Sequence, residues 1–178
     1  MKVRVFTSVL ILLLTLISCN SEPSLQKYFV ENNEKKDFIA IDVSSNILNL
    51  EKANLSAEQN EAIKSFDKMN ILAFKATDKN QAEFETERTK VNAILKDPKY
   101  QQLMKVGSGK DGASISYVGT DENIEEFVVF ANRKENGFAV VRVLGKNMNP
   151  NNIMTLMSVL QKSNIDMDQL KPLQQLIK

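Results

Sequence analysis

Residues 127–144, which read FVVFANRKENGFAVVRVL, decide the fold. They form two apolar runs on either side of Asn136-Gly137, a dipeptide that favours the positive φ angles of a tight hairpin turn. Apolar side chains alternate onto both faces of the predicted hairpin, whereas a half-buried sheet would carry them on one face only. We therefore expect helices of this chain to cover both faces, or the C-terminal tail or a partner to cover one of them.

The hairpin belongs to a series of four predicted strands. Alternation with a period of two covers residues 100–106, 113–119, 124–132 and 138–144, and turn residues separate these segments. Short connections between consecutive strands favour an antiparallel meander. The glycine-rich segment 107–112 fits a hairpin turn better than a phosphate loop, because the spacing of a P-loop is absent.

The chain before this meander mixes helical and extended patterns. A short helix is predicted from Leu25, with Ser24 as its N-cap, and a helical turn is predicted over residues 45–52. Apolar runs over residues 38–43 and 69–76 predict two further strands.

A second helix is predicted between these two strands. Ser56 and Gln59 have the spacing of a capping box, in which each side chain bonds to the backbone of the other residue. The helix that begins there is expected to turn Ile63 and Phe66 inward.

Residues 79–96 carry the clearest helical pattern, and Pro98 ends it. The predicted apolar stripe consists of Phe84, Val91, Ile94 and Leu95. Charged residues are expected to cover the other side of this helix: Glu83, Glu85, Glu87, Arg88 and Lys90.

A last helix is predicted to begin at Asn149-Pro150, with asparagine as the cap and proline in the first helical position. Its apolar side chains would be Ile153, Leu156, Met157 and Leu160, and a tail around Leu170, Leu173 and Ile177 would pack last. No repeat or linker divides the chain, so we predict a single α+β domain over residues 25–178. Its sheet would be mostly antiparallel, with a meander in the C-terminal half packed by several helices.

The N-terminus predicts a lipoprotein signal. Lys2 and Arg4 precede a short apolar run that ends in LISC at residues 16–19, and Cys19 is the only cysteine of the chain. This layout is typical of a secretory signal peptide over residues 1–18, and the tetrapeptide resembles the lipobox at which bacterial lipoprotein signal peptidase cuts. We expect Cys19 to become the acylated first residue; ordinary secretory cleavage, which would leave a free thiol, is the alternative.

Acylation of Cys19 would anchor the mature chain to a bilayer without a spanning helix. The tether, residues 19–24, is short: five extended residues after Cys19 reach about 20 Å, so the domain would work close to the lipid surface. Asn20 follows the cysteine where an aspartate would resemble an inner-membrane retention signal, which favours the outer membrane. Glu22 alone falls short of the acidic run of surface-exposed lipoproteins, which favours the periplasmic leaflet.

The composition excludes several classes of site. The chain has no histidine, and with Cys19 acylated neither Ser-His-Asp nor Cys-His catalysis nor a thiolate or imidazole metal site can be built. Lys and Arg number 23 against 22 Asp and Glu, and this balance argues against a nucleic-acid partner. We predict no catalytic residue, no metal site and no cofactor, while enzymes that use carboxylates, Lys, Ser or Tyr stay open.

Four residues are candidates for ligand binding. Arg142 lies within the apolar hairpin, where a buried guanidinium needs an anionic or carbonyl partner, so it is either a structural ion pair or a contact for a ligand anion. Asp121, Glu125 and Glu126, with Glu122 and Asn123 between them, could gather a calcium ion, but the EF-hand spacing is missing and a solvated turn is the better interpretation.

An ordered set of segments resembles a known family. The segments are LISC at 16–19, NILAF at 70–74, FETER at 84–88, YQQLM at 100–104, and GFAVVRVLG at 137–145 followed by MNP at 148–150. Together they are similar to the Bacteroidota lipoproteins catalogued as domain of unknown function 4252. The resemblance implies an envelope-anchored α+β domain without an assigned activity or catalytic residues. It also implies genes that often lie beside those for extracytoplasmic-function sigma factors and their regulators.

Two functional hypotheses follow. The favoured one is a non-enzymatic module that binds an envelope protein or peptide close to the outer membrane, in a stress-signalling context. The alternative is a small-ligand or ion-binding protein, or a carboxylate-dependent hydrolase, that uses Asp121, Glu125, Glu126 or Arg142.

Overall fold

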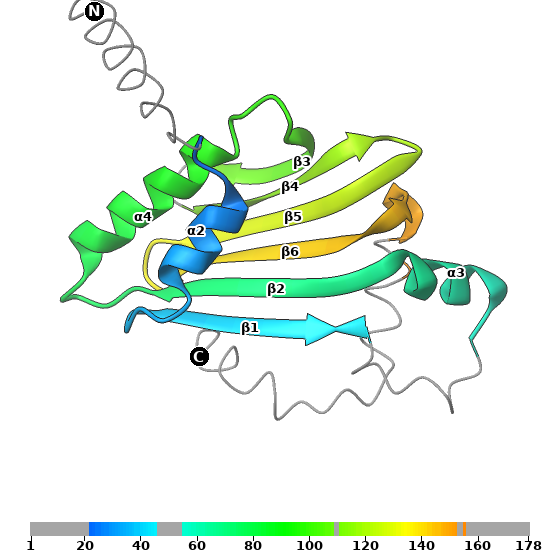
Figure 1. The fold of residues 1–178 in the computed structure, drawn as a ribbon. Helices are drawn as coiled ribbons and strands as arrows, with labels where there is room; N and C mark the ends of the chain where they lie inside the picture. The colour runs from blue at the N-terminus through cyan, green and yellow to red at the C-terminus, as the bar shows by residue number, and fades with distance from the viewer. Residues whose placement is uncertain (1–21, 46–54, 109–110, 153–154, 156–178) are drawn as a thin grey trace, which may run out of the picture.

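The computed structural model describes residues 22–45, 55–108, 111–152 and 155. In this part of the chain six strands form one sheet in the order β1-β2-β6-β5-β4-β3, and every neighbouring pair is antiparallel (Figure 1). The last four strands of the sequence are consecutive neighbours in the sheet. The predicted α+β fold with an antiparallel sheet is therefore confirmed. The strands are β1 (Phe38–Ser44), β2 (Phe66–Lys75), β3 (Gln101–Ser108), β4 (Asp111–Thr120), β5 (Asn123–Arg133) and β6 (Gly137–Met148).

Two helices, α2 (Leu25–Asn32) and α4 (Gln81–Ile94), cover one side of the sheet, which we call the α2–α4 face (Figure 1). The core on this face is rich in aromatic rings. Phe74 and Phe138 stack with centroids 5.6 Å apart, and Phe38 meets Phe74 edge-on at 5.1 Å. Phe84 from α4 contacts Phe74, and Tyr28 from α2 contacts Phe38, so both helices pack against this one aromatic cluster.

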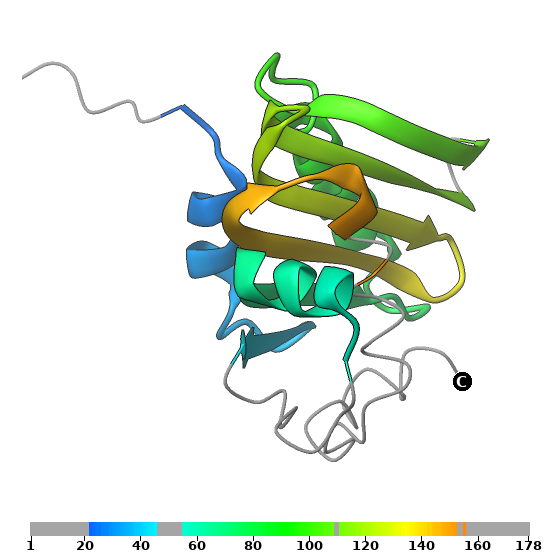
Figure 2. The ribbon, with the colours of Figure 1, turned by 90° about the vertical axis from the view of Figure 1, so that its right-hand side faces the viewer.

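The other side of the sheet, the α3 face, carries the helix α3 (Ala57–Ser65). Ile63 of this helix packs against a second cluster beside the end of β6. In Figure 2 α3 lies beside the C-terminal half of β6, while β3, β4 and β5 extend away from it. The buried members of this cluster are Phe66, Tyr117, Ile124, Phe127, Val143 and Met148.

Side-chain caps fix the starts of three helices. The Ser24 hydroxyl accepts a hydrogen bond from the Lys27 backbone N–H at the start of α2. Ser56 and Gln59 form both bonds of the predicted capping box. Asn149 accepts from the Asn152 backbone N–H, and Pro150 is the first helical residue after it. All three caps were predicted from the residue types.

Three local predictions differ from the structure. Phe66 begins β2 instead of ending a helix, because the chain passes from α3 into the strand without a loop. The helix predicted over residues 79–96 is shorter, since α4 spans Gln81–Ile94. In the β5–β6 turn only Gly137 has a positive φ, of 120°, and Asn136 belongs to a three-residue turn of ordinary φ.

Several predictions concern residues outside the described ranges. They are the signal peptide over residues 1–18, the acylation of Cys19 and most of the helical turn over residues 45–52. The apolar side chains of the last predicted helix, Ile153, Leu156, Met157 and Leu160, and the apolar tail around Leu170 also lie outside these ranges. Among the residues that are described, no helix is long and apolar enough to cross a membrane.

Candidate functional site

Arg142 lies on β6 and points onto the α2–α4 face beneath α2. Its Nε donates to Glu126 Oε1 at 2.5 Å, and its Nη1 donates to Gln26 Oε1 at 2.7 Å. The guanidinium carbon also lies 5.4 Å from the centre of the Phe29 ring. Only 5% of the Arg142 side chain and 13% of the Glu126 side chain are exposed, so the pair is shielded from solvent.

The partners of the buried guanidinium thus come from the chain itself. This is the structural ion pair that the sequence offered as one of two interpretations of Arg142. Because Gln26 and Phe29 belong to α2, the ion pair also joins that helix to the centre of the sheet. Among the described residues, no buried side-chain nitrogen or oxygen lacks a hydrogen-bond partner. The geometry around Arg142 is therefore that of a structural ion pair that holds α2 on the sheet.

The other candidate ligand residues do not gather around Arg142. Asp121 is exposed in the β4–β5 turn, where it accepts a hydrogen bond from the Tyr117 hydroxyl at 2.5 Å. That bond raises the pKa of the Tyr117 hydroxyl. Glu125 is exposed on β5, and of the other three candidates only Glu126 contacts Arg142. Within the described ranges, no group of three or more acidic side chains is arranged to hold a metal ion.

Glu87 is a buried carboxylate that the sequence pattern assigned to the outer side of α4. It is 4% exposed, and it accepts hydrogen bonds from the Tyr28 hydroxyl at 2.8 Å and from Lys90 Nζ at 2.7 Å. The sequence did indicate that Glu87 is buried. It follows Phe84 by three residues and precedes Val91 by four, which places it on the apolar stripe of the helix.

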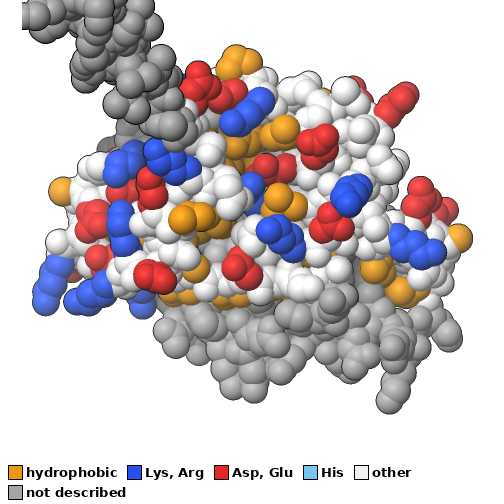
Figure 3. All heavy atoms as spheres, viewed as in Figure 1, with side chains coloured by type: hydrophobic (Ala, Val, Ile, Leu, Met, Phe, Trp, Pro, Cys, Tyr) orange, Lys and Arg blue, Asp and Glu red, His pale blue; other side chains and the backbone are white. Residues whose placement is uncertain are grey.

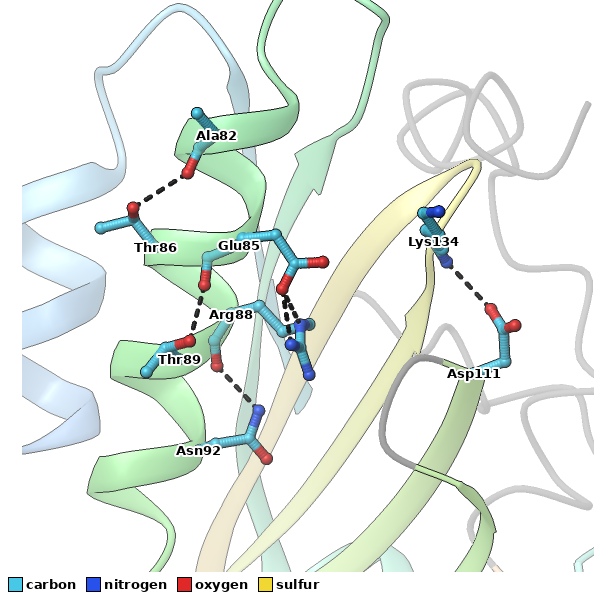
Figure 4. A network of polar contacts seen from close by, with 8 residues as sticks. All are labelled: Ala82, Glu85, Thr86, Arg88, Thr89, Asn92, Asp111 and Lys134. Carbon is cyan, nitrogen blue, oxygen red and sulfur yellow. Dashed lines mark hydrogen bonds and ion pairs between the residues drawn. The ribbon is translucent and has the colours of Figure 1, made fainter.

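The outer side of α4 is otherwise as predicted. Glu85 and Arg88 form an ion pair at 2.6 Å (Figure 4). The hydroxyls of Thr86 and Thr89 and the amide of Asn92 donate to backbone carbonyls one turn earlier. Seen from this side, the surface mixes acidic and basic side chains without a large patch of one sign (Figure 3).

A hollow of about 760 Å³ lies between the N-terminal end of α2 and the C-terminal end of α4. Pro23 lines it, together with Tyr28 and Ile94. Acidic and basic side chains alternate around its rim, so it has no strong preference for an anion or a cation: Glu22, Lys27, Glu31, Lys90, Lys96 and Asp97.

The edge strand β3 has a different character, because its apolar side chains are exposed. Of the four exposed large apolar side chains among the described residues, three belong to β3: Leu103, Met104 and Val106, which are 46%, 55% and 56% exposed. In that part of the chain β3 pairs only with β4, so one side of its backbone has no strand neighbour.

The register places two of the exposed side chains of β3, Met104 and Val106, on the α3 face. Met104 lies opposite Ile115, and Val106 lies opposite Ala113. Ile115 packs against the core cluster of the α3 face, and side chains two residues apart on a strand share a face. The apolar surface at the edge is thus continuous with the α3 face. It was missed from the sequence, because it depends on the strand order.

Comparison with known proteins gives one match. A family model described as Domain of unknown function (DUF4252) matches residues 28–156, which include all six strands. No curated protein and no solved structure matches the chain at a significant level.

Proposed function

The chain belongs to the DUF4252 family, and from this premise we propose that it is a non-enzymatic interaction module held close to a membrane by an acylated Cys19. Its partner is an envelope protein that binds the exposed apolar surface of β3 and the adjoining α3 face. The membrane is the outer membrane, with the domain on the periplasmic side, and the pathway is envelope stress signalling, which the family resemblance implies.

The observation that carries this proposal is the exposure of Leu103, Met104 and Val106 on an edge strand. Soluble proteins usually protect such edges with charges, prolines or a covering element, because an open apolar edge pairs with other chains. Here Lys105 is the one charged residue in the strand. Contact with a partner would bury these apolar side chains.

The polar candidates support a binding role over catalysis. Arg142, Glu126 and Glu87 are engaged in ion pairs or hydrogen bonds that hold α2 and α4 on the sheet. Asp121 and Glu125 lie apart from them. The buried charged side chains that could take part in catalysis therefore stabilise the fold. The surface that remains exposed and available to a partner is apolar.

The test is position-specific crosslinking in intact cells. A photoreactive amino acid replaces Met104 in the lipidated full chain, and a matched control carries it at Val30 of α2, which is 62% exposed and lies on the other side of the molecule. We expect one reproducible protein adduct from position 104 and none from position 30. The Cys19→Ala form should lose that adduct, because it is no longer held at the membrane.

Each outcome bears on a different part of the proposal. Equal adducts from positions 104 and 30 would remove the edge of β3 as the binding surface. An adduct that persists unchanged in Cys19→Ala would remove the membrane-proximal part and leave a soluble binding module.

A further inference from the structure

The α3 face contains a hollow of about 540 Å³ near the β3–β4 and β5–β6 turns. Its floor is a row of apolar residues from four adjacent strands: Val106, Ala113, Ala131 and Ala139. Ala131 is exposed, and Ala113 and Ala139 are partly exposed, so the floor is accessible from solvent.

Two further rows flank this floor on the same face, each two residues along the strands. On the side nearer α3 the row consists of larger apolar side chains: Met104, Ile115, Val129 and Val141. On the side of the turns the row is charged at Lys75, Arg133 and Asp111, with Gly137 between Lys75 and Arg133. We call the floor with these two rows the β3–β6 trough.

The dimensions of the trough suit a helix. The two flanking rows lie four residues apart along each strand, which is about 13 Å, and an α-helix with its side chains is about 10 to 12 Å across. The floor crosses four strands, or about 14 Å, a distance covered by about ten helical residues.

The rim of the trough carries an excess of positive charge. Lys75 and Arg133 are exposed, and neither forms an ion pair with another described residue. Asp111 is already engaged, since its Oδ1 accepts a hydrogen bond from the Lys134 backbone N–H at 2.9 Å (Figure 4). An occupant with acidic side chains along this rim would find two cations available.

We propose that the β3–β6 trough binds an amphipathic helix of a partner protein, with its apolar side on the floor and an acidic flank towards Lys75 and Arg133. The inference rests on the proposed interaction function and names the chemical class of the partner. The exposed Met104 packs against the apolar side of that helix, while Arg133 and Lys75 fix its direction through charge.

The test uses the lipidated full chain in nanodiscs and three synthetic stapled peptides of three to four helical turns. The first peptide carries Leu and Ala on one side and Glu along the flank. The second replaces Glu by Lys, and the third has the composition of the first in scrambled order. Fluorescence anisotropy should show binding of the acidic peptide, binding at least about tenfold weaker for the basic peptide, and none for the scrambled one.

Two sets of variants locate the site. Ala131→Leu fills the floor of the trough and should weaken binding of the acidic peptide at least about tenfold. Ala40→Leu is the matched control, because Ala40 is also an exposed alanine on a strand but lies on the α2–α4 face. The double variant Lys75→Glu/Arg133→Glu should reverse the preference, so that the basic peptide binds more tightly than the acidic one.

The outcomes separate this inference from the proposed function. Equal binding of acidic and basic peptides, or equal effects of Ala131→Leu and Ala40→Leu, overturns the helix trough. If the crosslink from position 104 forms in cells while no helical peptide binds, the interaction function stands and the helical partner is wrong. Occupation of the trough by a second copy, seen as an apparent affinity for the peptide that weakens as the protein concentration rises, also overturns it. So does a full chain that binds no peptide because its own C-terminal segment occupies the trough.

Discussion

Tyr28 shows, at the scale of the single residue, how α2 is held against α4. Its buried hydroxyl donates to Glu87 at 2.8 Å. A hydrogen bond to a charged group contributes about 1.5 to 3 kcal/mol, so we expect Tyr28→Phe to lower the free energy of unfolding by about 2 kcal/mol in urea denaturation. A loss below about 0.5 kcal/mol, the size of an ordinary surface change, would contradict this role.

The same hydroxyl makes stability depend on alkaline pH. Burial raises the pKa of Tyr28 above its ordinary value of 10.0, and the hydrogen bond and charge of Glu87 raise it further. Above pH 10 the tyrosine ionises in the unfolded chain but stays protonated in the folded one, so its stabilisation is complete below pH 10 and is lost as the pH rises. The wild type should therefore lose up to about 1.4 kcal/mol per pH unit more than Tyr28→Phe; parallel curves above pH 10 would argue against it.

Arg142 and Glu126 lend themselves to a double-mutant cycle. Removal of one partner leaves a buried charge unpaired, so we expect Arg142→Met or Glu126→Leu alone to cost about 3 to 5 kcal/mol. The double variant should recover a large part of that loss, because no unpaired charge remains. If the two single losses simply add in chemical denaturation, the pair is not the joint that its 2.5 Å contact indicates.

Predictions for single residues succeeded where the residue type allows few kinds of interaction partner. A guanidinium inside an apolar strand must find an acceptor, so the pairing of Arg142 was foreseeable, although not the identity of Gln26 and Phe29, which come from a distant helix. Glu87 was assigned to solvent because acids usually are, and its burial depends on a tyrosine 59 residues away.

At the scale of the element, Gly137 fixes where β6 meets β2. It has a φ of 120°, and a Cβ there would lie 1.9 Å from the backbone oxygen of Phe74. Gly137→Ala should therefore destabilise the protein by about 3 kcal/mol or more, since backbone strain adds to the steric clash. Thermal unfolding measures the loss, with Glu135→Ala in the same turn as a control that should change little; equal melting temperatures for the two variants would exclude the clash.

The helices and strands were predictable because their sequence signals are local, whereas the order of the strands in the sheet has no local signal. The alternation over residues 124–132 and 138–144 identified two strands, and Ser56 with Gln59 identified a helix start. The insertion of β6 between β2 and β5 has no local signal. The floor of the β3–β6 trough crosses four consecutive strands of the predicted meander, but which residues lie side by side on it depends on the register. The place of Lys75 on its rim depends on the pairing of β6 with β2.

At the scale of the whole molecule, the two faces of the sheet differ in role: one holds the helices, and the other exposes an apolar surface. The α2–α4 face contains the aromatic cluster and the buried ion pair, which hold both helices. The α3 face is covered near Ile63 and Val143 but exposes the apolar surface towards β3. A fold of this kind can present a binding surface without weakening its own core, because the two sets of side chains lie on opposite sides of the sheet.

The anchor and the fold are predicted to be separable. Five residues lie between Cys19 and Leu25, and among those of them that the structure describes only Ser24 caps a helix. Within the described ranges, the first strand of the sheet begins at Phe38. We expect Cys19→Ala to move the protein from the membrane fraction to the soluble fraction, because acyl chains supply the membrane affinity. Its melting temperature and circular dichroism should match those of the lipidated form in nanodiscs. A variant that stays with the membrane would show that another part of the chain binds lipid, and one that unfolds would show that the anchor supports the fold.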